Sequence, residues 1–91
     1  MNYRYGEKMT EENLSYENLK NANLSFVDLT GADLSGADLT RANPFRANLR
    51  DADLRGADLT GADLSNAYLT GAHGCEKLTQ ISEEQKKSVH C

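Results

Sequence analysis

Leucine recurs at every fifth residue through most of this 91-residue chain. Twelve consecutive slots run from residue 14 to residue 69, and all of them except Pro44 hold leucine. Alanine stands two places before each slot from Ala22 to Ala72, apart from Val27, and Asn or Asp stands just before each slot from residue 13 to residue 63. The chain is therefore a run of short repeats with the pattern A-[DN]-L-x-x. The eleven leucines are Leu14, Leu19, Leu24, Leu29, Leu34, Leu39, Leu49, Leu54, Leu59, Leu64 and Leu69.

A period of five fits neither an α-helix nor a flat β-strand, whose periods are about 3.6 and about 2. Within each repeat, alanine and leucine are two residues apart, so both face the same side of a short extended segment. The other three positions must face outward and turn the chain. Four such segments and four corners close one coil, and stacked coils lie about 4.8 Å apart through backbone hydrogen bonds. The period therefore predicts a four-sided tube.

The interior of this tube is predicted to hold the leucines along its axis, with alanines where the wall comes close to the axis. Because four repeats of five residues make one coil, Leu24, Pro44 and Leu64 lie on the same side of successive coils. The repeats make about three coils in all. Glycines at the second position after several slots are expected to relax the corners. Asn and Asp before the leucines are expected to bond the turn amides. The predicted core adds these alanines to the leucines: Ala32, Ala37, Ala42, Ala47, Ala52, Ala57 and Ala62.

These repeats resemble the pentapeptide repeat proteins, and the resemblance covers about Glu12 to His73. It implies an all-β fold, the right-handed quadrilateral β-helix of that family, here with about three coils. For function the resemblance implies less, because the family includes many members with no assigned activity.

Three segments follow from where the repeats begin and end. Residues 1–11 form an N-terminal cap segment, 12–73 the repeat β-helix, and 74–91 a C-terminal cap. A capping-box pattern, Ser82 with Gln85 three residues later, predicts a short α-helix from about Glu83 to Ser88. Both caps are needed because the mouths of such a tube expose apolar core and unpaired edges.

Two glutamates take the place of alanine in the first repeats, at Glu12 and Glu17. An unpaired carboxylate cannot lie inside the tube, so both are expected at the open first coil with their carboxylates in solvent. A pair of catalytic carboxylates is the alternative. Tyr3, Tyr5 and Met9 are expected to cover this mouth.

Pro44 interrupts the leucine run and removes one backbone donor from the wall. Phe45 follows it at an outward position, on the same side as Phe26 one coil earlier. The sequence therefore predicts a small apolar patch that can contact a partner. The candidate contact residues are Phe26, Pro44, Phe45 and Arg46.

Four arginines cluster in the middle of the sequence, at Arg41, Arg46, Arg50 and Arg55. Their spacing puts them on successive sides, so they form a belt rather than the single basic face that a nucleic acid needs. Carboxylates lie close by in the sequence, which predicts solvated salt bridges instead. The acidic neighbours are Asp38, Asp51, Asp53 and Asp58.

The net charge of −4 argues against direct binding to nucleic acid or to an anionic membrane. No stretch of the sequence reaches the length of a membrane span, and the N-terminus lacks an apolar signal core, so a cytoplasmic location is expected. The order of His73, Cys75, His90 and Cys91 fits no common zinc spacing. No metal or cofactor is expected, and a link between Cys75 and Cys91 is left open.

The sequence contains no phosphate loop, nucleophile elbow or metalloprotease motif, and a tube filled by its own leucines has no pocket. We therefore expect no enzyme. The predicted role is a module for protein–protein interaction with an unknown protein partner, or with a second copy as a homodimer. The alternative comes from the resemblance, because some members mimic duplex DNA and bind type II topoisomerases such as DNA gyrase. Nine acids lie between residues 12 and 63, but five cations reduce their net charge to −4.

Overall fold

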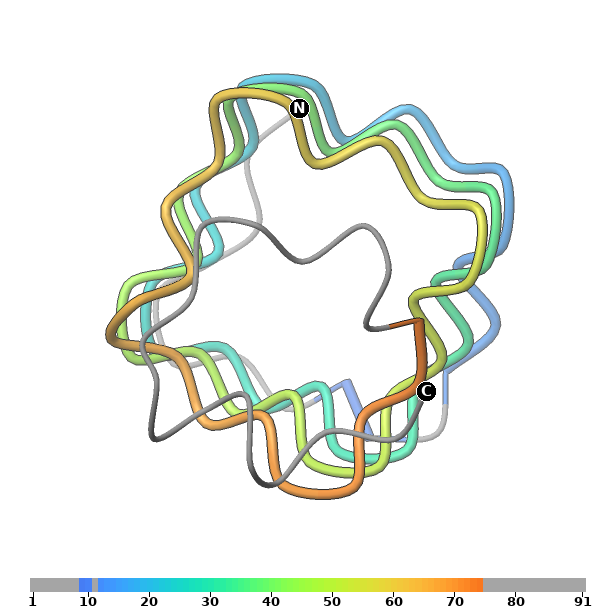
Figure 1. The fold of residues 1–91 in the computed structure, drawn as a ribbon, viewed down its shortest axis with the longest axis vertical. Helices are drawn as coiled ribbons and strands as arrows, with labels where there is room; N and C mark the ends of the chain where they lie inside the picture. Colours follow the sequence, from blue (N-terminus) through green and yellow to red (C-terminus); the bar gives the residue numbers. More distant parts are fainter. Residues whose placement is uncertain (1–8, 11, 75–91) are drawn as a thin grey trace.

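The computed structural model describes residues 9–10 and 12–74 of the chain. The described chain winds into coils that lie over one another when viewed along the tube (Figure 1). Among these residues there is no helix, and the sides of the tube pair through single bridge residues instead of longer strands. Every bridge is parallel and joins residues twenty apart, which confirms the predicted coil. The bridges are Asn13–Asp33, Asn18–Asp38, Asn23–Asn43, Asp28–Asn48, Asp33–Asp53, Asp38–Asp58, Asn48–Tyr68 and Asp53–His73.

Backbone hydrogen bonds between neighbouring coils hold the wall together. On one side of the tube, the N–H of Leu34 donates to the carbonyl of Asp53 at 2.8 Å, and the N–H of Asp53 donates back to Ala32 at 3.0 Å. A third bond joins the corners, from the N–H of Gly36 to the carbonyl of Arg55 at 3.0 Å. Each side therefore needs only a few residues to satisfy its buried backbone groups.

The interior is filled by the residues of the repeat. All eleven leucines are buried, none with more than 6% of its surface exposed, and the alanines from Ala22 to Ala72 and Val27 are buried with them. Burial of one leucine side chain contributes about 2 kcal/mol, and the ordering of the backbone opposes most of the sum. The side chains that the repeat places inward are thus the ones that stabilise the tube.

Each corner is a tight turn closed by a backbone hydrogen bond and supported by the Asn or Asp before the leucine slot; where Ser or Thr follows the slot, its hydroxyl can add a third bond. At one of them, the N–H of Ala37 donates to the carbonyl of Leu34 at 3.1 Å. Before the turn, Oδ1 of Asp33 accepts the N–H of Ser35 at 3.0 Å and its hydroxyl at 2.6 Å. The same backbone bond to Asn or Asp recurs from residue 13 to residue 63, which confirms the predicted role of these side chains.

The second residue after each slot has positive φ at eleven of the twelve corners from residue 16 to residue 71. Glycine adopts this conformation freely, whereas other residues pay about 1–2 kcal/mol for it. Sequence reasoning identified the glycines but not the six other residues that share the conformation. These six are Tyr16, Asn21, Phe26, Arg41, Arg46 and Asp51.

Large side chains at these corners need room on the next coil. The side chain of Arg41 lies across Gly61, where an added Cβ would come within 2.9 Å of its Cγ. Gly36 is covered in the same way by the ring of Tyr16. Glycine is therefore required at such a corner for the space above it as well as for its φ.

Pro44 breaks the wall locally, as the sequence predicts. It has no N–H to donate to Asp63, and the N–H of Asp63 makes none of the bonds that its counterparts on other sides make to the coil before. The bridge that would join Asn43 to Asp63 is also absent from this part of the chain. The regular bonds resume at once, with the N–H of Leu49 donating to Tyr68 at 2.7 Å.

The corner at Ser65 and Asn66, which stacks on the corner after Pro44 in the next coil, differs from the others in its backbone. Asn66 stands where positive φ is the rule, but its φ is not positive. A turn of this kind rotates the peptide between residues 65 and 66. The rotation accounts for the missing bond from the N–H of Arg46 to the carbonyl of Ser65, which the other corners retain.

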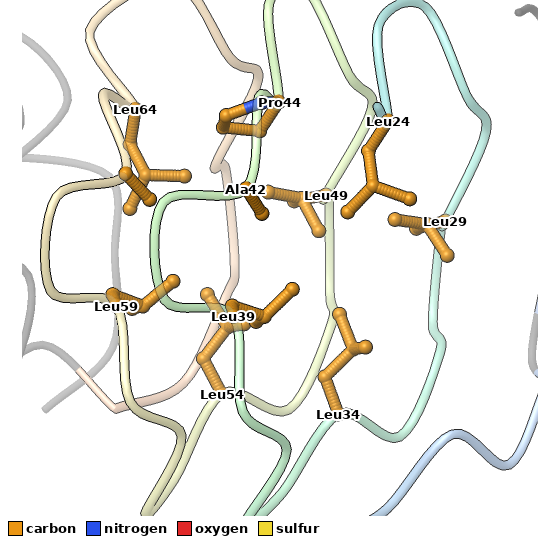
Figure 2. A pocket seen from close by; sticks show the side chains of 11 residues that line it. Leu24, Leu29, Leu34, Leu39, Ala42, Pro44, Leu49, Leu54, Leu59 and Leu64 are labelled. Carbon is orange, nitrogen blue, oxygen red and sulfur yellow. The ribbon is translucent and has the colours of Figure 1, made fainter. Parts of the chain in front are cut away.

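The core is also looser beside Pro44. Its ring lies between Leu24 and Leu64 of the neighbouring coils and is shorter than the leucine it replaces (Figure 2). The side chains around it line a small apolar void with a volume of about 10 Å³. Because a buried water needs polar partners, this void stays dry.

The first coil meets solvent as expected. Glu12 and Glu17 are both exposed, in agreement with their predicted place at the open mouth. Met9 packs against the core, and its N–H donates to the carbonyl of Asp28 at 2.7 Å. Tyr3 and Tyr5 lie outside the described residues, as does the predicted helix from Glu83 to Ser88.

At the other end, Gly74 takes the slot where leucine is due and is buried. A Cβ there would come within 2.9 Å of the backbone of Leu54, so only glycine lets the chain lie this close to the coil before.

Replacing Ala52 by leucine should destabilise the tube by about 1–3 kcal/mol, because the wall at this fully buried position has no room for three more carbons. Thermal unfolding followed by circular dichroism measures the change. The matched control is Thr70→Leu at an exposed position, which should change stability by less than about 0.5 kcal/mol. Equal melting temperatures for the two variants would contradict the inward orientation of Ala52.

Replacing Pro44 by leucine should stabilise the chain by about 1 kcal/mol, since it restores a backbone donor and fills the void. Pro44→Ala is the control, because it restores the donor and leaves the void. Denaturant unfolding should therefore rank the leucine variant above both the alanine variant and the parent. A leucine variant that is less stable than the parent would show that the ring of Pro44 is needed where it lies.

Candidate interaction surface

Exposed aromatic side chains gather around one side of the tube. Four large apolar residues are exposed in the described chain: Tyr16 by 82%, Phe26 by 37%, Phe45 by 42% and Tyr68 by 45%. Tyr16 lies at a different corner of the tube, the one that follows Leu14. Phe26 and Phe45 occupy the corner that precedes the side of Asn48, and Tyr68 follows Asn48 on that side in the next coil.

The two phenylalanines contact each other across neighbouring coils. Their ring centroids are 5.7 Å apart and the ring planes meet at 70°, which is the edge-to-face arrangement that aromatic pairs prefer. Phe26 has a φ of 63°, so the corner holds a bulky residue where glycine costs least. Five other non-glycine corners share this conformation, so the aromatic contact, and not the strain, distinguishes this corner.

Two arginines lie on the aromatic rings of the same side. The guanidinium carbon of Arg46 is 5.7 Å from the centroid of the Phe45 ring, and that of Arg50 is 4.7 Å from the Tyr68 ring. Both distances fit cation–π contacts. We name these five residues the aromatic–arginine surface: Phe26, Phe45, Arg46, Arg50 and Tyr68.

The structure corrects one of the predicted contact residues. Pro44 is buried in the core and lines the void, so its ring cannot touch a partner. The reason is that Pro44 occupies a leucine slot, and the slot faces inward whatever residue fills it. Phe26, Phe45 and Arg46 do lie together on the surface, and their role as contacts stays a prediction.

The salt bridges predicted for the four arginines are corrected as well. Arg55 alone of the four arginines pairs with a carboxylate in the described chain, 2.7 Å from Asp53. Arg41 instead donates from Nε to the amide oxygen of Asn21 at 3.1 Å. The guanidinium groups of Arg46 and Arg50 lie over the rings of Phe45 and Tyr68 instead of beside a carboxylate. Salt bridging was therefore the wrong expectation for three of the four.

Tyr68 and Arg50 are members of the surface that sequence reasoning missed. The coil of twenty residues contains the signal, since it stacks Tyr68 on Asn48 and puts Arg50 at the next corner of the same side. The sequence analysis used this stacking to place Phe26 beside Phe45 but did not extend it to the next side.

Carboxylates line two other sides of the tube. The bridges stack Asp33 on Asp53 and Asp38 on Asp58. A side-chain hydrogen bond from Arg55 lowers the pKa of Asp53 to about 2, and hydrogen bonds from Thr40 lower the pKa of Asp38. Asp53 and Asp38 are therefore ionised at neutral pH, and their oxygens are already engaged by the turns that follow them.

The described residues show no group of three or more side chains that could hold a metal ion. His73 is exposed and its backbone bridges to Asp53, whereas Cys75, His90 and Cys91 lie outside the described residues. Among the described residues, no helix is long and apolar enough to span a membrane.

A coil of twenty residues, an apolar axis and outward-facing corners define a solenoid whose variable residues lie on its surface. The chain matches the sequence profile of pentapeptide repeats in eight copies, over residues 13–43 and 46–73. The chain therefore belongs to the pentapeptide repeat family. The gap between the two matched segments falls on Pro44 and Phe45, where the wall and the surface depart from the repeat.

Solved structures of the same family are similar to this chain. HetL, a pentapeptide repeat protein involved in heterocyst differentiation regulation from Nostoc sp. strain PCC 7120, is 41% identical with a TM-score of 0.76, over 80% of this chain and 34% of its own. Rfr23 from the cyanobacterium Cyanothece 51142 is 34% identical with a TM-score of 0.68, over 81% of this chain and 45% of its own.

A third similar structure is QnrB1, a plasmid-mediated fluoroquinolone resistance protein. It is 20% identical with a TM-score of 0.60, over 85% of this chain and 51% of its own, so the likeness shows the fold alone. This chain spans between a third and about half of the length of these three structures. No curated protein matches it.

The ion pair of Asp53 and Arg55 gives a pH dependence of stability. The pKa of Asp53 falls from 3.8 to about 2 on folding, so the pair stabilises the chain above pH 3.8 and the contribution is lost as the pH falls to about 2. Because Arg55 is exposed, the contribution is at most about 1 kcal/mol. Arg55→Ala should therefore lower the melting temperature slightly at neutral pH and leave it unchanged below pH 2. A difference that persists in acid would assign the effect to packing of the arginine stem.

Proposed function

We propose that this chain is a non-enzymatic module that binds another protein through the aromatic–arginine surface. The observation that carries the proposal is the gathering of three exposed aromatic rings and two arginines around one side of a rigid tube. Tyrosine, phenylalanine and arginine are the residue types enriched at protein interfaces. The fold supports a binding role because its interior is fully used by its own leucines.

Backbone strain is a second support. Glycine is the residue that the corners tolerate best, yet Phe26 and Arg46 stand there with φ of 63° and 55°. Each costs about 1–2 kcal/mol relative to glycine. Four further corners hold non-glycine residues at similar φ, so this strain supports the proposal only together with the rings and arginines that gather on one side.

Catalysis has no support in the described residues. The family consists in general of structural and interaction modules, and the void beside Pro44 is apolar and, at about 10 Å³, smaller than a substrate. Glu12 and Glu17, the pair considered as catalytic, are exposed at the mouth of the tube without a cleft around them.

A DNA-mimic role at a type II topoisomerase is the alternative. Duplex DNA carries about one charge per 1.7 Å, so about three coils at 4.8 Å correspond to roughly nine charges. The repeats carry a net charge of only −4 between residues 12 and 63, and Arg55 neutralises Asp53 within the acidic sides. The charge distribution therefore favours the interaction surface over mimicry.

The main proposal is tested by affinity capture from a lysate of the source organism. The chain as bait should retain one or more proteins that Phe45→Ala combined with Arg46→Ala no longer retains. Tyr16→Ala combined with Arg55→Ala is the matched control, since it removes an exposed aromatic residue and an exposed arginine elsewhere. Equal capture by all three baits would contradict a role for this surface.

A gyrase supercoiling assay tests the alternative. The chain at micromolar concentration should leave supercoiling unchanged, because its net charge is too low for the groove that duplex DNA fills. Inhibition that survives the Phe45→Ala and Arg46→Ala changes would support mimicry and contradict the main proposal.

A further inference from the structure

We propose that the aromatic–arginine surface recognises an acidic protein segment that carries an apolar anchor residue. This inference rests on the proposed function and adds the chemistry of the partner. It follows from the state of the two arginines, from the rings beside them and from the geometry of one side of the coil.

The guanidinium groups of Arg46 and Arg50 are held in place but unpaired. Each lies over an aromatic ring, and neither donates a side-chain hydrogen bond within the described residues. Both arginines are exposed, so the N–H donors of each guanidinium remain open to solvent. The fork of N–H donors on a guanidinium can bind a carboxylate through two parallel hydrogen bonds, and the contact with the ring restricts the rotamers of the arginine before it binds.

The carboxylates near this surface do not neutralise it. Asp28 lies on the same side in the first coil, where it accepts the N–H of Thr30 at 3.2 Å and its hydroxyl at 2.6 Å. Asp51 follows Arg50 at the corner and lies against Gly71 on the next coil instead of pairing with the arginine. Both cations of the surface therefore remain available to a carboxylate of another molecule.

The rings supply the apolar part of the contact. Phe26 and Phe45 stay 37% and 42% exposed while they pack edge to face, so a partner side chain can cover them without moving them. Because they adjoin Arg46, one partner residue on the rings brings a neighbouring carboxylate within reach of the fork. Apolar anchors beside charge-assisted hydrogen bonds are typical of interaction hot spots.

The spacing of the two arginines sets the length of the segment. Arg46 and Arg50 lie at the two corners of one side, and four residues of chain span at most about 14 Å. An extended peptide of about five residues covers this distance. Acidic residues at both ends with an apolar residue near one of them fit the surface.

The test uses the full chain and a fluorescein-labelled synthetic peptide, Glu-Glu-Phe-Glu-Glu-Leu-Glu. Fluorescence anisotropy should show saturable binding that weakens strongly when the salt concentration rises about tenfold. Arg46→Ala with Arg50→Ala should weaken binding at least about tenfold, and Phe45→Ala should do so as well. Arg55→Ala and Tyr16→Ala are the matched controls and should leave binding unchanged. Circular dichroism confirms that each variant is folded.

Four outcomes of the binding assay overturn the proposal. They are no binding of the peptide, equal binding of its all-glutamine counterpart, tighter binding of a phosphoserine counterpart, and tighter binding of a single-stranded oligonucleotide. Sedimentation that shows self-association lost in the Arg46→Ala and Arg50→Ala variant assigns the surface to a second copy and also overturns it. Surface-dependent capture from lysate together with failure of the acidic peptide would leave the interaction module in place and remove only the acidic partner.

Discussion

Everything in this structure depends on one constraint, that the leucine of each repeat and the backbone around it must satisfy two requirements at once. The side chain fills the axis of the tube, and the N–H on the same residue reaches the coil twenty residues ahead, as from Leu34 to Asp53 at 2.8 Å. A residue that fills the axis but cannot donate its backbone N–H interrupts the wall. Pro44 is buried like a leucine, yet the wall around it loses its bonds.

Because the interior is fixed, variation is confined to the corners and to the residue before each leucine. The corner position that prefers glycine accepts Phe26 and Arg46 at a cost in backbone strain, and it is there that aromatic rings and arginines accumulate. The same corner holds the departures from regularity at Pro44 and Asn66. Features that weaken the repeat and features that offer binding chemistry thus coincide on one side of the tube.

The period of five predicted the coil, its sides and the buried residues, because it follows directly from side-chain direction in a short extended segment. Asn and Asp were assigned correctly to the turns for the same local reason. The wrong predictions concerned long side chains that can reach several partners. The arginines near carboxylates were expected to form salt bridges, but Arg46 and Arg50 contact aromatic rings and Arg41 donates to the amide oxygen of Asn21. Tyr68 was missed because the stacking by coil was applied to the phenylalanines and not to the side that follows them, where Tyr68 lies over Asn48.

The ladder of backbone bonds can be observed directly in solution. Trans-hydrogen-bond couplings in an NMR experiment link an amide nitrogen to the carbonyl carbon that accepts from it. A coil of twenty residues gives couplings from Leu34 to Asp53 and from Leu39 to Asp58, and none from Arg46 to Ser65. Couplings between pairs that are neither bonded across neighbouring coils, such as Leu34 to Asp53 and Asp53 to Ala32, nor bonded within a turn, such as Ala37 to Leu34, would contradict this structure. A continuous ladder through the side of Pro44 would contradict it as well.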